Sequence, residues 1–345
     1  MKTLTLIAGL TLFLPSCIEE ETVTTFFRPD GSLKQVLEFV TDRKDFSPSG
    51  LATPLDSTWQ VEVRRDTADT SRYRVVATKN YLSVKELNDA YRHATGLMKG
   101  VKREVSFEKK FMWFYTFYYY QETVYAVFDG KELQEFVSPE ELRYLQSDGE
   151  WLPPRLEGKD STLIRAFSRT AQSHFTEWMG SRYFERWWKG MMRLAKDRPT
   201  DRFTPERLEE MRDTLRTIYC RTFFDLPGND ELPSFFLAGF GLDPLTLLHR
   251  YPVYFREFRE LEEKTFFMAD YENRVVLPGK MFDTNADVVE DGRPVWHVLP
   301  TRFLPEDFDM FAASREPNPW AWVVAVLVLI FAGVMFFPKK KGVRR

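Results

Sequence analysis

The amino-acid sequence predicts an α+β fold: an antiparallel-sheet ectodomain with an inserted helical subdomain, followed by one C-terminal transmembrane helix. Three observations predict it. Runs that alternate apolar and polar residues, which is the period of a strand, occur before residue 130 and after residue 265. Between these two regions apolar residues recur at helical spacing. Residues 320–337 form an uncharged apolar run.

The first β-rich region begins with a predicted hairpin. The runs 22–27 and 33–40 are rich in β-branched and aromatic residues, and Pro-Asp-Gly at 29–31 supplies turn chemistry between them. Alternating runs at 59–63 and 73–75 predict two further strands.

Residues 111–120 carry aromatic side chains on both faces of a predicted strand. A strand that is apolar on both faces is usually central in its sheet and covered on both sides. The alternative is an aromatic groove for a lipid, a glycan or a peptide, in which tyrosine hydroxyls offer polar contacts. On that interpretation the candidate binding residues are Trp113, Tyr115, Tyr118 and Tyr120.

Residues 131–264 are predicted to form the helical insertion. Ser138, followed by Pro and two Glu, is typical of a helix N-terminus. The segment 183–188, Tyr-Phe-Glu-Arg-Trp-Trp, places large aromatic side chains on more than one side of a helix. These side chains either pack on neighbouring elements or anchor a partner, because Trp, Tyr and Arg are enriched among interface anchors. Trp187 and Trp188 are the candidate binding residues here.

Strands resume after the helices. Residues 286–289 and 295–299 flank Asp-Gly at 291–292, a strong hairpin signal. The late strands are too few to bury a core alone, so we expect 18–130 and 265–315 to form one domain around the insertion. The alternative is two sequential domains with a terminal β extension.

The first residues resemble a lipoprotein-type signal peptide over 1–17. Lys2 supplies a positive charge, and the apolar segment 4–14 is too short to span a bilayer. The segment ends in Leu-Pro-Ser-Cys at 14–17, which resembles a bacterial lipobox, in which the cysteine is lipidated. Cys17 is therefore the predicted lipidation site. The alternative is an ordinary signal peptide with a bystander cysteine.

The other end predicts a membrane span over residues 320–337. This run of 18 residues carries no charge and covers about 27 Å as a helix. Trp320 and Trp322 suit an interfacial belt, and five of the last seven residues are Lys or Arg. The positive-inside rule then predicts a basic cytoplasmic tail over 338–345 and an extracytoplasmic ectodomain on the bacterial cytoplasmic membrane.

The order of these parts resembles the LppM-type bacterial envelope lipoproteins. The shared parts are the lipobox, the early strands around Pro-Asp-Gly-Ser, the helix signal Leu-Ser-Val-Lys-Glu-Leu at 82–87, the late strands over 277–298 and the terminal anchor. The resemblance covers about half of the chain and does not include the helical insertion. It implies a membrane-tethered domain of lipid-binding character, with no catalytic residues to carry over.

No motif for catalysis, a metal or a cofactor is found. Residues 283–294 begin like a calcium loop, but Val288 and Pro294 stand where Gly and Glu are required. None of the four histidines has a second His or a Cys at ligand spacing. Cys220, with apolar neighbours, is predicted to be a buried structural cysteine. We therefore expect no catalytic residue, no metal and no cofactor.

The near-neutral net charge of −3 argues against a nucleic-acid partner. The predicted function is that of a membrane-tethered envelope lipoprotein, a non-enzymatic binding or assembly module for an envelope protein or a lipid. One alternative is an envelope hydrolase with an unrecognised active site, because carboxylates distant in sequence can converge in a fold. The other is a structural subunit of a membrane complex.

Overall fold

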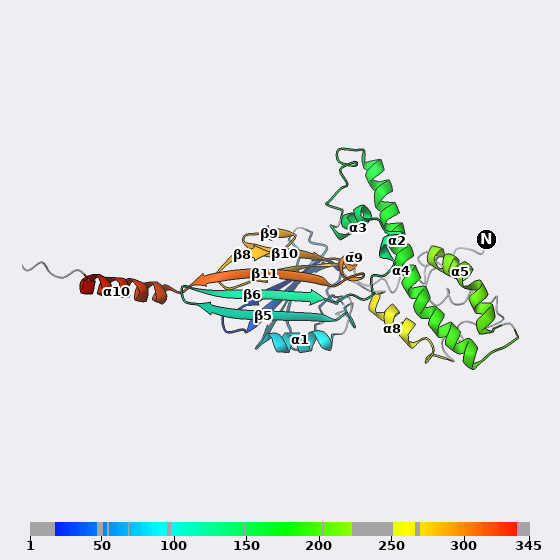
Figure 1. Cartoon of the computed structure of the whole chain (residues 1–345), viewed down its shortest axis with the longest axis horizontal. Coiled ribbons are helices and arrows are strands. Elements are labelled where there is room, and N and C mark those ends of the chain that lie inside the picture. Colours follow the sequence, from blue (N-terminus) through cyan, green and yellow to red (C-terminus); the bar gives the residue numbers. More distant parts are fainter. Residues whose placement is uncertain are drawn as a thin grey trace, which may run out of the picture.

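The computed structural model describes residues 18–46, 51–53, 55–67, 69–94, 98–147, 149–201, 203–222, 251–265 and 270–336. Two β-sheets form the centre of the molecule, a group of helices lies at one end of them, and helix α10 projects from the other end (Figure 1).

The strands fall into two groups along the chain, six before the helical region and five after it, among the described residues. The early strands are β1 (Ile18–Phe27), β2 (Leu33–Thr41), β3 (Gln60–Arg65), β4 (Tyr73–Tyr81), β5 (Arg103–Met112) and β6 (Tyr115–Val124). The late strands are β7 (Tyr271–Val276), β8 (Lys280–Thr284), β9 (Val288–Glu290), β10 (Arg293–Val298) and β11 (Phe308–Pro317).

The helices are gathered mainly in the middle of the chain. They are α1 (Val84–Arg92), α2 (Leu133–Phe136), α3 (Pro139–Gln146), α4 (Ser161–Asp197), α5 (Pro205–Thr222), α8 (Arg256–Thr265), α9 (Pro300–Phe303) and α10 (Pro319–Phe336).

Early and late strands are mixed in both sheets. The seven-stranded sheet has the order β3-β4-β2-β1-β7-β10-β9, and the four-stranded sheet has the order β5-β6-β11-β8. Strand β1 pairs with β7 in parallel, whereas the other pairings are antiparallel. The α+β character and the antiparallel pairing predicted from the sequence thus agree with the structure, apart from this one parallel pair.

The aromatic run 111–120 forms a hairpin rather than one strand. Strand β5 ends at Met112 and β6 begins at Tyr115, so the turn falls on Trp113 and Phe114. No Gly, Asn or Asp marks this turn, which explains why the sequence pattern indicates a continuous strand. Strand β6 is nevertheless central in its sheet, between β5 and β11.

The two sheets face each other across a core that contains a buried polar network. The Arg103 guanidinium donates two hydrogen bonds to one Glu122 carboxylate oxygen, at 2.7 and 3.0 Å, and both side chains are only 3% exposed. The Tyr120 hydroxyl donates to the other oxygen at 2.6 Å, and Asn273 Nδ2 reaches it at 3.2 Å. Arg103 also donates to the Tyr91 hydroxyl of α1. A charged pair is therefore satisfied from both sheets and from a helix.

Helix α1 covers the edge strand β5 of the smaller sheet. Ser83 caps the helix, as its side chain accepts a hydrogen bond from the Glu86 amide. The Asn88 side-chain amide bonds both backbone groups of Val105 at 2.8 Å, in place of a neighbouring strand. This contact protects backbone groups that an edge strand otherwise exposes.

The helical group has a separate, aromatic core. Helix α4 runs unbroken for 37 residues, and its buried face packs against α2, α3, α5 and α8. The rings of Phe184, Trp187 and Tyr219 lie 5.6 to 6.0 Å apart. Gly190 of α4 permits a close approach of the segment just before α8, since a Cβ there would lie 2.7 Å from the Tyr254 carbonyl oxygen.

The C-terminal helix differs from the prediction. In the part of the chain that the structure describes, no helix has both the length and the apolar character required to cross a membrane. The first turn of α10 packs against the β5–β6 hairpin, and the 14 residues from Val323 to Phe336 cover only about 21 Å. The predicted transmembrane helix over 320–337, and with it the placement of a tail in the cytoplasm, is therefore wrong.

Several predicted features lie outside the described residues. They are the signal peptide over 1–17 with Cys17, and the tail over 338–345.

Candidate binding surfaces

An aromatic collar surrounds the base of α10. It consists of Phe111, Trp113, Phe114, Trp320 and Trp322. The ring of Trp320 stacks on Phe111 at 6.1 Å and meets the edge of Trp113 at 5.4 Å, while Trp322 lies 4.5 Å from Phe114. Trp113 is 49% exposed and Trp320 50%. Four of the five rings are about half exposed although they contact one another, so they form an apolar surface at this end of the molecule.

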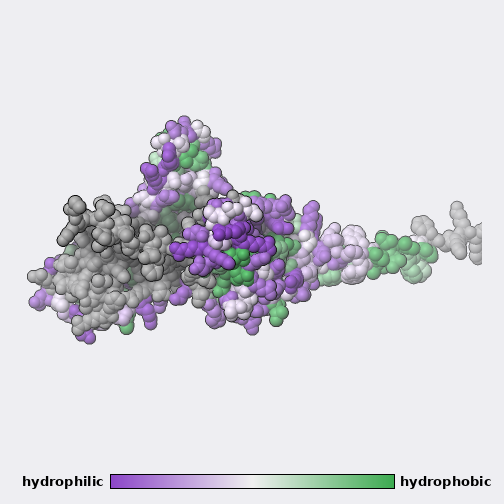
Figure 2. Space-filling model, turned by 180° about the vertical axis from the view of Figure 1, so that it is seen from behind, coloured by the Kyte–Doolittle hydropathy of each residue, from purple (hydrophilic) through white to green (hydrophobic). Residues whose placement is uncertain are grey.

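Asn318 fixes α10 to the hairpin. Its backbone amide donates to the Phe114 carbonyl oxygen at 2.8 Å, and its side chain donates to the Trp113 carbonyl oxygen at 3.1 Å. The Thr116 hydroxyl completes the joint by donating to the Asn318 side-chain oxygen at 3.0 Å. The two facing sheets are here called the sandwich. The helix α10 thus leaves the sandwich in a defined direction, and its exposed apolar side chains extend the collar (Figure 2).

Basic side chains lie next to the collar. Lys109 and Lys110 lie near the C-terminal end of β5, which ends at Met112. Arg315 of β11 and Lys280 of β8 are neighbours in register at the same end of the four-stranded sheet. All four are exposed. Two acids, Glu108 and Glu316, lie among them, so this end of the sheet carries a small positive excess.

The predicted binding residues of the aromatic run divide by face. Tyr118 and Tyr120 point into the core and are 2% and 1% exposed. Tyr115 is half-buried and its ring lies 6.5 Å from Trp322, beside the collar. Of the predicted groove residues, Trp113 and Tyr115 therefore reach a surface, whereas Tyr118 and Tyr120 support the core.

Trp187 and Trp188 lie in the aromatic core of the helical group. Trp187 is 0% exposed and Trp188 5%. Neither side chain presents a surface to a partner among the described residues, so their structural role is packing between helices.

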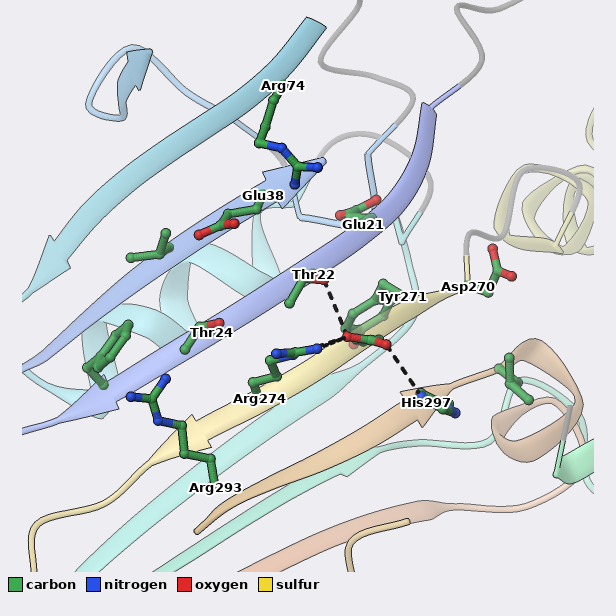
Figure 3. A pocket seen from close by; sticks show the side chains of 14 residues that line it. Glu21, Thr22, Thr24, Glu38, Arg74, Asp270, Tyr271, Arg274, Arg293 and His297 are labelled. Atoms are coloured by element: carbon green, nitrogen blue, oxygen red, sulfur yellow. Dashed lines mark hydrogen bonds and ion pairs between the residues drawn. The ribbon is translucent and has the colours of Figure 1, made fainter. Parts of the chain in front are cut away.

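A second candidate site is a cavity of about 670 Å³ on the outer face of the seven-stranded sheet, here called the sheet cavity. It crosses strands β4, β2, β1, β7 and β10, and its lining mixes acids, bases, threonines and apolar side chains (Figure 3). The lining residues are Glu21, Thr22, Thr24, Phe26, Val36, Glu38, Arg74, Asp270, Tyr271, Glu272, Arg274, Arg293, His297 and Leu299.

Strand register places these side chains in rows. Glu38, Thr22, Glu272 and His297 are direct neighbours across β2, β1, β7 and β10. The row two residues further along β1 holds Val36, Thr24 and Arg274. Phe26 and Val276 form the next row, toward the end of β10 that carries Arg293. The acids Glu38 and Glu272 thus share one row, with Arg74 beside that row, whereas Arg274 and Arg293 lie toward the other end of the sheet cavity.

Most of the charges in the sheet cavity are paired. Arg274 donates to Glu272 at 2.7 Å and approaches Glu290 at 3.3 Å. His297 Nε2 lies 3.5 Å from Glu272. Arg74 pairs with Asp66. Glu38 and Arg293 are exposed and have no hydrogen-bond or ion-pair partner among the described residues.

Glu21 is the buried acid of the sheet cavity. Its carboxylate oxygens accept hydrogen bonds from the backbone amides of Ala52 and Thr53, at 3.0 to 3.3 Å. Burial nevertheless dominates and raises the pKa of the Glu21 carboxyl to about 7, although the two amide donors and Arg103 oppose the shift. This carboxyl therefore changes charge near neutral pH.

Asn285 and Cys220 are accounted for by their surroundings in the fold. Asn285, in the loop that begins like a calcium site, accepts hydrogen bonds from Trp296 Nε1 and from the Phe311 amide and so joins the two sheets. Burial raises the pKa of the Cys220 thiol to about 11, which keeps it protonated. Within the described residues, no group of three or more His, Cys, Asp or Glu side chains could hold a metal ion.

Comparisons with known proteins add one likeness. No protein-family model matches the chain, and no curated protein matches it. Among solved structures, the chain is similar to the folded domain of the LppM protein of Mycobacterium tuberculosis, determined by NMR, with 10% sequence identity and a TM-score of 0.28 over 90% of this chain and 97% of that one. The resemblance to LppM-type envelope lipoproteins is thereby confirmed as a resemblance. At this TM-score it carries no argument about a site or an activity.

The sequence did not point to the sheet cavity. Its lining comes from five strands and two loops between residues 21 and 299. The Pro-Asp-Gly turn predicts the pairing of β1 with β2, but no sequence signal places β7 and β10 beside them. The collar could have been found in part, since Trp113, Trp320 and Trp322 stand out by residue type.

Proposed function

We propose that the protein is an envelope lipoprotein with a non-enzymatic binding role, and that the aromatic collar contacts a lipid bilayer surface. The observation that supports this most is the collar itself: half-exposed tryptophan rings grouped at the base of an apolar helix. Trp and Tyr favour the membrane–water interface because one part of the ring is apolar and the other can be hydrated.

The charges beside the collar fit the same surface. Lys109, Lys110, Lys280 and Arg315 lie where headgroups would meet a molecule whose collar rests in the interface. Anionic lipids attract each such cation by about 1 kcal/mol close to the surface. A protein partner would need a complementary apolar pocket, whereas a bilayer accepts rings at several angles.

Lipidation at Cys17 would set the orientation of the molecule. Strand β1 begins at Ile18, at the end of the sandwich next to the helices, and runs toward the turn where Lys109 donates to the Pro29 carbonyl oxygen. The lipid attachment and the collar would therefore be more than about 33 Å apart, the length of the ten-residue strand β1, because the collar lies beyond the end of that strand. If both meet one bilayer, the strands lie along its plane.

The hydrolase alternative would have to use the sheet cavity, where acids converge. Glu21, whose pKa suits a general acid, already accepts two backbone hydrogen bonds, and Glu272 is held by Arg274. These contacts favour a binding role. The alternative of a structural subunit has no specific observation in its favour.

Lipidation is tested by mass spectrometry of the mature protein. We expect an N-terminal peptide that begins at Cys17 and carries the mass of attached acyl chains. An unmodified cysteine in the mature chain would contradict the lipoprotein assignment.

The collar is tested by fluorescence quenching with brominated lipids. The full chain is placed in vesicles of phosphatidylethanolamine and phosphatidylglycerol, and the quenched tryptophan emission is compared among variants. Trp113→Phe and Trp320→Phe should each remove part of the quenched emission, because these rings would lie within reach of the bromine atoms.

Trp151→Phe is the matched control, since Trp151 is also partly exposed but belongs to the helical end. We expect this change to leave the quenched fraction unaltered. Equal losses from Trp113→Phe and Trp151→Phe, or no quenching of the unaltered chain, would refute contact through the collar.

A further inference from the structure

We propose that the sheet cavity binds a short peptide with free termini, its ammonium group at the Glu38 side and its carboxylate at Arg293. The inference starts from Glu38 and Arg293, two charged side chains of the lining that have no hydrogen-bond or ion-pair partner among the described residues; a third, Asp270, adds to the acidic side. Glu38 and Arg293 carry opposite charges, and Figure 3 shows them on either side of Thr24.

The unpaired charges exclude simpler ligands. A lone anion would face Glu38, Glu272 and Asp270, and a lone cation would face Arg74, Arg274 and Arg293. An apolar ligand would remove water from Glu38 and Arg293 without replacing their hydrogen bonds, which is costly for charged groups. A ligand with a cationic end and an anionic end satisfies both poles at once.

Sheet spacing sets the length of that ligand. Glu38 and the row of His297 are three strand spacings apart, about 14 Å, and Arg293 lies four residues along β10, about 13 Å away. The two Cα atoms are thus roughly 19 Å apart, and the two side chains shorten the gap that the ligand must span. An extended peptide of three to five residues covers about 10–17 Å.

The groups between the two poles suit a peptide backbone. The hydroxyls of Thr22 and Thr24 can donate to carbonyl oxygens or accept from amides, and Thr24 has no side-chain partner among the described residues. Phe26 and Val36 supply apolar contact beside them. The cavity of about 670 Å³ lies within the usual size of a small-ligand site.

The test uses alanine peptides of three to six residues with free termini, titrated by calorimetry against the full chain. Each peptide is compared with its N-acetylated and C-amidated forms. We expect saturable binding of the free peptides and about tenfold or more weaker binding after either block, since each block removes one charge-assisted contact.

Variants then assign each end of the peptide. Glu38→Gln should weaken the free peptide but not the acetylated one, and Arg293→Gln should weaken the free peptide but not the amidated one. Glu62→Gln is the matched control, because Glu62 lies in the same row of the sheet, two strands from Glu38 and outside the cavity. It should leave affinity unchanged.

Three results would overturn the proposal: no binding by any free peptide, equal affinity for free and blocked peptides, or equal effects of Glu38→Gln on free and acetylated peptides. The test is independent of the lipid surface, because Trp113→Phe should leave peptide affinity unchanged while it alters quenching in vesicles.

Discussion

The sandwich and the helical group are stabilised by different kinds of core. The sandwich places Arg103 and Glu122 between its sheets and satisfies them with hydroxyl and amide groups. The helical group has no such pair among its described core residues and relies on contacts between rings such as Phe184 and Trp187. A buried ion pair is stable only when every charged group has hydrogen-bond partners, whereas an aromatic core is stable when its rings fill the available volume. The two regions should therefore respond differently to the loss of one residue.

The largest effect is expected at the charged centre. Arg103→Leu leaves Glu122 buried without its cation and should lower the free energy of unfolding by about 3–5 kcal/mol. The double change Arg103→Leu with Glu122→Leu should recover part of this loss, because no unpaired charge remains. Urea unfolding followed by circular dichroism measures both. If the double variant is no more stable than Arg103→Leu, the pair does not act as a coupled unit.

A similar loss of stability is expected in the aromatic core, but here no second substitution should restore it. Trp187→Ala opens a cavity among buried rings and should cost about 3–5 kcal/mol. Trp187→Phe should lose less, since part of the volume is kept. The same unfolding measurement applies. A loss below about 1 kcal/mol for the alanine variant would mean that the helical core is loosely packed.

Glu21 tests whether the sandwich accepts another buried charge. Its folded-state pKa of about 7 lies above the ordinary value of 4.5, so the folded chain holds the proton more tightly. Stability from this group is therefore complete below about pH 4.5 and declines as pH rises through 7, by about 3 kcal/mol in all. Glu21→Gln should remove that decline. Thermal unfolding between pH 5 and 8 compares the slopes, and equal slopes would show that Glu21 does not titrate in this range.

The smallest effect concerns the contact of α4 with Tyr254 and Phe255, just before α8. Gly190→Ala favours an isolated helix by about 1 kcal/mol. Here, however, the added Cβ would lie 2.7 Å from the Tyr254 carbonyl oxygen and 2.8 Å from the Phe255 ring. Displacement of this segment from α4 should outweigh the gain and cost about 1–3 kcal/mol. Ala195→Gly, at another buried position of α4, is the opposite control and should cost about 1 kcal/mol. A stabilised Gly190→Ala would mean that the approach is not tight.

Local signals predicted the elements well. Turn residues at 29–31 and 291–292 mark real hairpins, and Ser138 does form a capping box with Glu141. Long-range arrangement was less accessible. The parallel pairing of β1 with β7 joins residues about 250 apart, and nothing in either strand encodes the other. The turn at Trp113 lacks turn residues and was missed for that reason.

Candidate site residues show the same difference between local and long-range information. Residue type identified Trp113 but could not separate it from Trp187, which has the same side chain in a buried place. Exposure depends on what packs against a residue, and that is set by the tertiary fold. The sheet cavity depends on register across four strand pairs, so it could be recognised only after the strands were placed.

The opposite positions of the β1 start and the α10 base have a mechanical consequence. A pull between these two points runs along the strands, since β1 enters at the helical end and β11 leaves at the collar. Such a force loads in shear the hydrogen bonds that join β1 to β2 and β7, and those that join β11 to β6 and β8. Hydrogen bonds loaded in this way resist together instead of opening one after another. Under tension between these two points, the two sheets should therefore resist extension without their strand pairs separating one after another.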